Sequence, residues 1–168
     1  MILGFRRDRT THDVDARIEA DKEAVTEAAA DVAQVHDLPQ NWLNENATLF
    51  MPHARDTQAR TVFDTPNLVV TGASPQHLLA MKLDAARDTD QQDIRTLLET
   101  LQIQAREEAI DIHQRIFPHT PLGQAGREIL DRSLAEIARQ RTREPPPEES
   151  ALDDGSGTVD PPADAAGP

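Results

Sequence analysis

The residues with the clearest potential for chemistry are two aspartates, Asp13 and Asp15, which one valine separates. The alternation of polar and apolar residues from Asp13 to Ile18 predicts a short strand with its three apolar residues on one face. Both carboxylates would then project from the opposite face, roughly 6 to 7 Å apart along the strand. Such a pair can bind Mg²⁺ together with substrate phosphates. A solvated acidic pair is the alternative in a chain with 30 acidic residues.

Positively charged side chains occur both before this pair and far beyond it in the chain. The preceding stretch, RRDRTTH, includes Arg9 and Thr11 and suits an anionic ligand such as a nucleotide. Lys82 is one of only two lysines, beside fifteen arginines, and lies in a mostly apolar segment. A lysine in that setting either extends its ammonium to solvent from a helix edge or serves as a point charge for a phosphate.

The first half of the chain predicts a helix and a few strands around these residues. Residues 21–36 have apolar residues at helical spacing and acids in the first turn, and the helix is expected to end before Pro39. Residues 40–52 are expected to form a short helix or turns whose rings close the core. Residues 61–72 predict one or two strands around a turn. The rings are those of Trp42 and Phe50, and the apolar helix face comprises Val25, Ala28, Ala29, Val32 and Val35.

The second half predicts a run of helices. Ser74 followed by Pro75 has the pattern of an N-cap and a first helical residue. Four amphipathic segments follow, with breaks at 88–89, near 103–104 and at 118–123. Arginines and acids alternate along the last segment, which predicts a solvated, ion-paired face. A few strands followed by helices predict an α+β fold with a small mixed sheet and a helical C-terminal half.

Length and charge predict one domain with an acidic tail. The chain has 168 residues and a formal net charge of -13, which argues against bulk coating of nucleic acid. Residues 1–72 are expected to form a sheet region with a helix, and residues 73–143 a helical region packed on it in the same domain. Residues 144–168 hold seven acidic residues and no basic one, and are expected to be a disordered, Pro-rich tail.

Composition also excludes several classes of site. The chain has no Cys, which rules out disulfides, thiolate zinc sites and cysteine nucleophiles. Its six His residues show no pair spaced three or four apart, as a helical zinc motif requires. No apolar run approaches the roughly 20 residues that span a bilayer, and the N-terminus is unlike a secretory signal. We therefore expect a cytoplasmic protein without a membrane partner.

Three segments in the same order carry a more specific signal. They are THDVDA at 11–16, LPQNWLNENATLFMP at 38–52 and GASPQHLLAMKLDAARDTDQQDI at 72–94. Together they resemble the nucleotidyltransferase-like proteins related to the abortive-infection toxin AbiEii, and the resemblance runs from about residue 3 to 117. It implies a polymerase-β-type nucleotidyltransferase fold. By the same resemblance, Asp13 and Asp15 are catalytic metal ligands, Lys82 contacts nucleotide phosphates, and Asp93 is the acidic residue of the last motif.

The resemblance implies Mg²⁺-dependent transfer of a nucleotidyl group from an NTP to RNA or to protein. Such a protein would act as the toxin of a toxin–antitoxin pair, with a cognate antitoxin as partner. The alternative is a catalytically inactive relative that serves as a binding or regulatory, antitoxin-like module with a toxin as partner. The four matching residues Asp13, Asp15, Lys82 and Asp93 favour the enzyme.

One departure from the family pattern favours the inactive relative. Members carry a Gly-Gly or Gly-Ser pair at a helix N-terminus about ten residues before the acidic pair, where backbone amides approach the triphosphate. Here twelve residues precede Asp13, and the only candidate is Gly4-Phe5. The sequence thus predicts either a longer natural protein or the loss of the first helix. Asp64 is a candidate third carboxylate or, alternatively, the cap of the turn that follows it.

Overall fold

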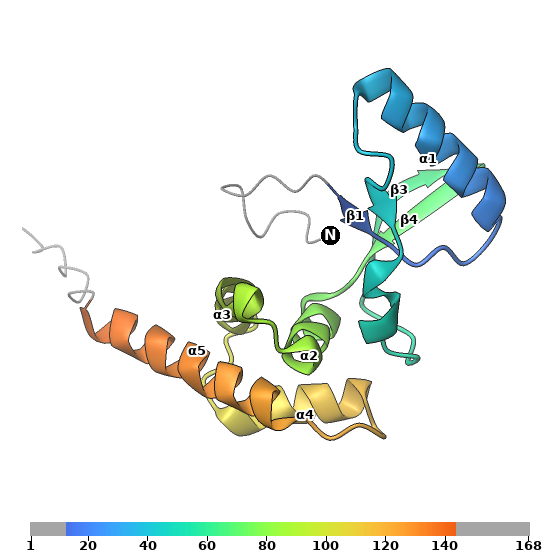
Figure 1. Ribbon diagram of the computed structural model, residues 1–168. Coiled ribbons are helices and arrows are strands. Elements are labelled where there is room, and N and C mark those ends of the chain that lie inside the picture. Colours follow the sequence, from blue (N-terminus) through green and yellow to red (C-terminus); the bar gives the residue numbers. More distant parts are fainter. Residues whose placement is uncertain (1–12, 144–168) are drawn as a thin grey trace, which may run out of the picture.

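The computed structural model describes residues 13–143, in which two short sheets and one helix precede four packed helices. In Figure 1 the strands and α1 lie at the upper right, and α2 to α5 lie below them. The α+β class expected from the sequence is confirmed. The elements are β1 (Val14–Asp15), α1 (Lys22–His36), β2 (Leu43–Asn44), η1 (Asn46–Phe50), β3 (Arg60–Thr65), β4 (Leu68–Gly72), α2 (Pro75–Ala85), η2 (Asp88–Asp90), α3 (Gln91–Thr100), α4 (Arg106–Ile116) and α5 (Gln124–Arg143).

The described strands form two separate two-stranded sheets, where the sequence had predicted one mixed sheet. β1 pairs with β2 in parallel, and β3 pairs with β4 in antiparallel. The first sheet stays small because β2 has only two residues before the chain turns into η1. Beyond it, the Ile18 N–H donates to the Glu45 side chain at 3.3 Å and not to a strand.

The strand predicted over residues 13–18 is therefore shorter, but its alternation is confirmed. Exposed and half-buried residues alternate along this stretch, with Val14 half-buried and Asp13 and Asp15 exposed. The Ala16 N–H still donates to the Asn44 carbonyl at 2.8 Å, which extends the strand-like path by one residue. The two aspartates thus share the exposed face of β1, as the pattern had indicated.

The helix predicted over residues 21–36 is confirmed as α1, but its predicted apolar face is only partly covered. Ala29 and Ala33 are buried, and the indole N–H of Trp42 donates to the Ala29 carbonyl at 2.8 Å. Val32 and Val35, which were expected to be buried, are 38% and 78% exposed. The small alanine side chains let Trp42 approach the helix, whereas the valines beside them meet no covering element among the described residues.

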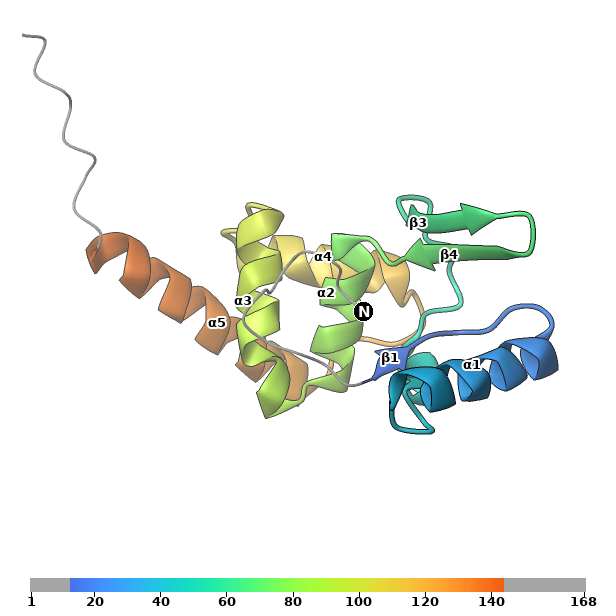
Figure 2. The same ribbon diagram turned by 90° about the horizontal axis from the view of Figure 1, so that it is seen from above.

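The two strands predicted within residues 61–72 form the hairpin β3–β4, which Figure 2 shows apart from α1. Its turn is capped by Thr65, whose hydroxyl accepts from the Leu68 N–H at 3.1 Å and lies 3.2 Å from the Leu68 carbonyl. Asp64 is exposed within β3 opposite Val69, so the alternative of Asp64 as a turn cap is wrong.

The main core lies between the four helices of the second half. Ser74 is the N-cap of α2, as predicted, and its side chain accepts from the His77 N–H. Trp42 and Phe50 are half-buried and lie outside this core, contrary to expectation, because they belong to segments between α1 and β3. The core consists of Leu79, Ala80, Leu83, Ile94, Leu97, Leu98, Ile103, Ala109, Ile112, Ile116, Leu122, Ile129, Leu130 and Ile137.

The charges on α5 connect it to the other helices more than to one another. Arg132 pairs with Asp88 of η2 at 3.2 Å. Glu136 accepts from Arg95 of α3 at 2.9 Å, and Asp131 lies 2.9 Å from Arg106 of α4. The ion-paired face predicted for this helix therefore pairs with the neighbouring helices, while the buried face of α5 joins the core. No helix within residues 13–143 is long and apolar enough to cross a membrane.

We expect acid to weaken the attachment of α1 through Glu45. The Lys22 ammonium and the Ile18 N–H, both hydrogen-bonded to this carboxylate, lower the pKa of Glu45 below its ordinary value of 4.5. A carboxyl whose pKa is lower in the folded state stabilises the fold above the unfolded pKa, and this contribution is lost as the pH falls through the folded pKa. The wild type should therefore have a higher free energy of unfolding than Glu45→Gln at about pH 7, and this difference should decrease as the pH is lowered to about 3. Urea unfolding at both pH values measures it. A constant difference would contradict this prediction.

Candidate functional site

The carboxylates of β1 are held at a sheet edge by backbone contacts. The Val14 N–H donates to the Trp42 carbonyl at 2.5 Å, and Asp15 lies opposite Asn44 in the parallel register. Because Val14 faces inward, Asp13 and Asp15 both face outward. The strand geometry therefore offers two oxygen ligands on one face.

The second group of predicted residues meets where α2 turns into α3. The Lys82 Nζ atom lies 2.6 Å from Oδ1 of Asp90 and 2.9 Å from Oδ2 of Asp93. The three side chains are 20%, 16% and 19% exposed, so this contact is largely shielded from solvent. We call these three residues the Lys82 cluster. The alternative of a lysine that extends to solvent is wrong.

Local chain geometry explains how the Lys82 cluster forms. α2 ends at Ala85, and its C-cap residue Ala86 adopts the left-handed conformation with φ 46° and donates its N–H to the Lys82 carbonyl. η2 then reverses the chain, and Asp90 and Asp93 come at the start of α3. Acidic residues at a helix N-terminus are favoured by the helix dipole, so this turn suits both carboxylates. In this cluster, two carboxylates therefore share one ammonium group.

Replacing Lys82 with methionine is expected to destabilise the fold by about 1 to 2 kcal/mol, because it leaves two shielded carboxylates facing each other. Adding Asp93→Asn to this variant should restore part of the loss, since it removes the repulsion. The matched control is Lys22→Met, because the Lys22 side chain is 68% exposed and its pair with Glu45 should contribute little. Urea unfolding measures all three. Equal losses for the two lysines would contradict the prediction.

Contacts of η1 bring the acidic strand and the Lys82 cluster to the same side of the molecule. η1 contacts both β1 and α2. Its last residue, Phe50, lies under the guanidinium of Arg87, with 5.0 Å between the Arg87 Cζ atom and the ring centroid. Arg87 directly precedes η2, which carries Asp90. Figures 1 and 2 show β1 on the side of the helical half where α2 ends and α3 begins.

Several predicted residues lie elsewhere or outside the described part. Arg9, Thr11 and Gly4 precede residue 13, and the expected tail follows residue 143. Asp64 is exposed on the hairpin. Among the described residues, no three His, Asp or Glu side chains gather closely enough to hold a metal ion. A third carboxylate beside Asp13 and Asp15 is therefore not found in residues 13–143.

Two histidine contacts could not be anticipated from the sequence. His113 of α4 is fully buried, its Nε2 atom lies 3.2 Å from Oδ1 of Asp84, and its ring stacks on Phe117 at 5.1 Å. His77 of α2 places Nδ1 3.3 Å from Oδ1 of Asp56, in the loop before β3. Each pair joins segments distant in sequence. The only sequence signal was the position of His113 on the apolar face of its helix.

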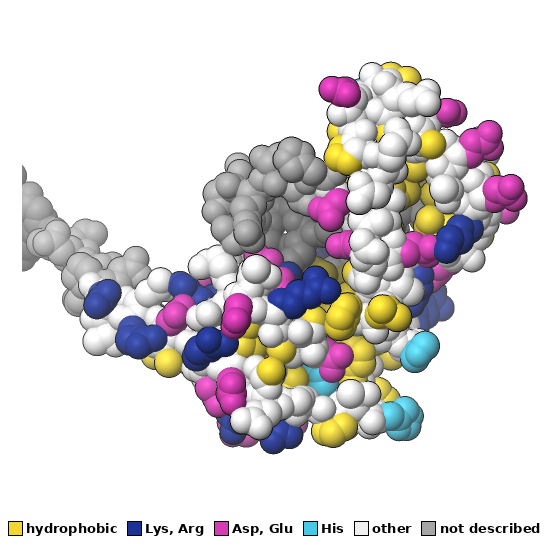
Figure 3. All heavy atoms as spheres, viewed as in Figure 1, with side chains coloured by type: hydrophobic (Ala, Val, Ile, Leu, Met, Phe, Trp, Pro, Cys, Tyr) yellow, Lys and Arg dark blue, Asp and Glu magenta, His cyan; other side chains and the backbone are white. Residues whose placement is uncertain are grey.

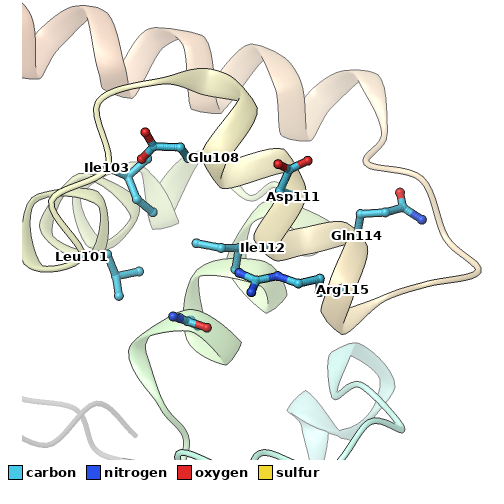
Figure 4. A pocket seen from close by; sticks show the side chains of 8 residues that line it. Leu101, Ile103, Glu108, Asp111, Ile112, Gln114 and Arg115 are labelled. Carbon is cyan, nitrogen blue, oxygen red and sulfur yellow. The ribbon is translucent and has the colours of Figure 1, made fainter.

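A pocket of about 620 Å³ lies away from these residues. Figure 4 shows side chains of α4 along one wall and residues of the α3–α4 connection along another. None of the residues predicted to carry chemistry lines it. The lining residues are Gln76, Leu101, Ile103, Glu108, Asp111, Ile112, Gln114 and Arg115.

The two carboxylates on the exposed face of β1 are suitable ligands for a magnesium ion. Asp13 and Asp15 offer carboxylate oxygens from one exposed face. Mg²⁺ is commonly held by one or two carboxylates together with substrate phosphates and water, so two protein ligands suffice in the presence of a nucleotide.

Comparison with known proteins adds no further assignment. No family model, no curated protein and no solved structure matches the chain. The class that the structure defines is an α+β protein with two small sheets and a helical C-terminal half. Any function assigned to it therefore rests on its own residues and on the resemblance noted in the sequence.

Proposed function

We propose that this protein is a nucleotidyltransferase that moves a nucleotidyl group from an NTP to RNA or protein. The observation that carries the proposal is the Lys82 cluster, in which Lys82 meets Asp90 and Asp93 at distances of 2.6 and 2.9 Å. The resemblance implied roles for Lys82 and Asp93 in one site, and a direct contact between them supports that reading.

In the proposed site, the side chains of β1 and of the α2–α3 junction have separate tasks. Asp13 and Asp15 would hold Mg²⁺, which lowers the pKa of an attacking hydroxyl and neutralises phosphate charge when bound. Asp90 and Asp93 engage the Lys82 ammonium, which has three donors, and so fix its position. Lys82 would then present its remaining donor to a phosphate oxygen.

The reaction itself exchanges one phosphate bond for another. An oxygen of the acceptor forms a bond to the α-phosphorus of the NTP while the bond from that phosphorus to the β-phosphate oxygen breaks. Pyrophosphate leaves, and the proton of the acceptor hydroxyl passes to solvent. Catalysis of this kind depends on positioning and charge stabilisation more than on covalent participation of the protein.

The test is incubation of the full chain with an α-labelled NTP, Mg²⁺ and total RNA or protein as acceptor. We expect label to appear in one acceptor class and to be abolished by EDTA. A γ-labelled NTP serves as control, because nucleotidyl transfer releases that phosphate as pyrophosphate. Transfer of γ label, or no transfer of α label, would contradict the proposal.

The second candidate is a catalytically inactive, antitoxin-like module that acts as partner of a toxin. It is supported by the two carboxylates that already engage the Lys82 ammonium, because they compete with a phosphate for its donors. This candidate predicts that no acceptor receives α label.

A further inference from the structure

Arg87 lies at the α2–α3 junction and has no carboxylate partner among the described residues. It is exposed and forms no ion pair within residues 13–143, whereas Lys82 contacts two carboxylates. The neighbouring Asp88 pairs with Arg132 of α5. In Figure 3, dark-blue Lys and Arg atoms lie where the strand-containing half meets α2.

Phe50 fixes where the Arg87 guanidinium lies. The Cζ atom stands 5.0 Å from the ring centroid, a separation at which cation and ring attract each other. A guanidinium that stacks on a ring engages only its flat face, and its N–H donors point outward from the edge. Those donors match the spacing of two phosphate oxygens. The contact with the ring therefore restrains the Arg87 side chain, which remains exposed to a ligand.

We propose that Arg87 is a second phosphate-binding residue of this site, in addition to Lys82, and that Phe50 is its positioning residue. The ligand class is the polyphosphate chain of a nucleotide. The inference deepens the proposed function and rests on it for the identity of the nucleotide. Phe50 belongs to η1, an element that contacts both β1 and α2, and Arg87 follows the C-terminal end of α2.

Binding of inorganic tripolyphosphate to the full chain in the presence of Mg²⁺, measured by calorimetry, tests this inference. Arg87→Ala should weaken binding by about tenfold or more, because charge-assisted hydrogen bonds are lost. Arg87→Lys should retain part of it. Phe50→Leu should weaken binding by about two- to fivefold, since the charge remains but its position is no longer fixed. The matched control is Arg139→Ala, an exposed arginine of α5 without an ion pair among the described residues.

The outcomes separate this inference from the proposed function. Tripolyphosphate binding that depends on Arg87, without transfer of α label, would support the phosphate site and contradict the transferase. Transfer of label by a chain whose tripolyphosphate binding is unaffected by Arg87→Ala would overturn the inference alone. Equal weakening by Arg87→Ala and Arg139→Ala would also overturn it, because the effect would then reflect overall charge. Thermal unfolding of each variant confirms that the fold is retained.

Discussion

Replacing Gly126 with alanine is expected to destabilise the protein by about 3 kcal/mol and to lower Tm by about 10 °C. A Cβ atom at this position would lie 2.4 Å from the Leu83 carbonyl oxygen of α2 and 2.5 Å from a methyl group of Leu122. The first of these neighbours is backbone and cannot move aside without shifting α2 against α5. In a helix that met no neighbour, the same change would stabilise by roughly 0.5 to 1 kcal/mol.

The control for this prediction is the other glycine at the start of α5. Gly123 precedes the helix, and a Cβ atom there would meet nothing within 4 Å. Gly123→Ala should therefore change the free energy of unfolding by no more than about 1 kcal/mol, the cost of a less favourable residue at the helix start. Thermal and urea unfolding of both variants provide the comparison. A Gly126→Ala variant as stable as the wild type would mean that α5 does not cross α2 at this distance.

Replacing Asp13 with asparagine is expected to lower nucleotidyl transfer by about two orders of magnitude or more. The change keeps the size of the side chain but removes one of the two carboxylate charges on the exposed face of β1. The effect on the free energy of unfolding should be much smaller, about 1 kcal/mol or less, because Asp13 is exposed. Activity and stability should therefore respond differently. Initial rates with an α-labelled NTP, together with urea unfolding, measure the two effects.

The comparison variant is Asp31→Asn, which removes an exposed carboxylate of α1. It changes the net charge by the same amount and should leave the transfer rate unaffected. Raising Mg²⁺ should partly restore the rate of Asp13→Asn if this residue binds the ion. Full activity of Asp13→Asn would remove Asp13 from the proposed site, and equal losses in both variants would indicate a general effect of charge.

Sequence reasoning was most accurate where a single local pattern decides the structure. The Ser74-Pro75 pair identified the start of α2, because a capping hydroxyl and a fixed φ angle act within one turn. Alternation along residues 13–18 identified the exposed face of β1. The hairpin β3–β4 followed from β-branched residues on both sides of a turn.

Sequence reasoning was less accurate where the burial of a residue depends on a second element that packs over it. Val32 and Val35 belong to an apolar stripe of α1, yet they are 38% and 78% exposed, whereas Ala29, whose carbonyl accepts from Trp42, is buried. Phe50 was expected in the core and instead supports Arg87. Helical periodicity shows which residues share a face, but not whether another segment lies on it.

What the sequence by itself determined is the α+β class, the order of the helices and the residues that could carry chemistry. The tertiary structure alone decided which charges meet. Lys82 lies between Asp90 and Asp93 because α2 ends in a left-handed residue and α3 turns back beside it. The His113–Asp84 pair likewise depends on how α4 packs against α2. The reason is physical: local propensity acts over a few residues, whereas ion pairs and close backbone contacts depend on elements brought together by a shared core.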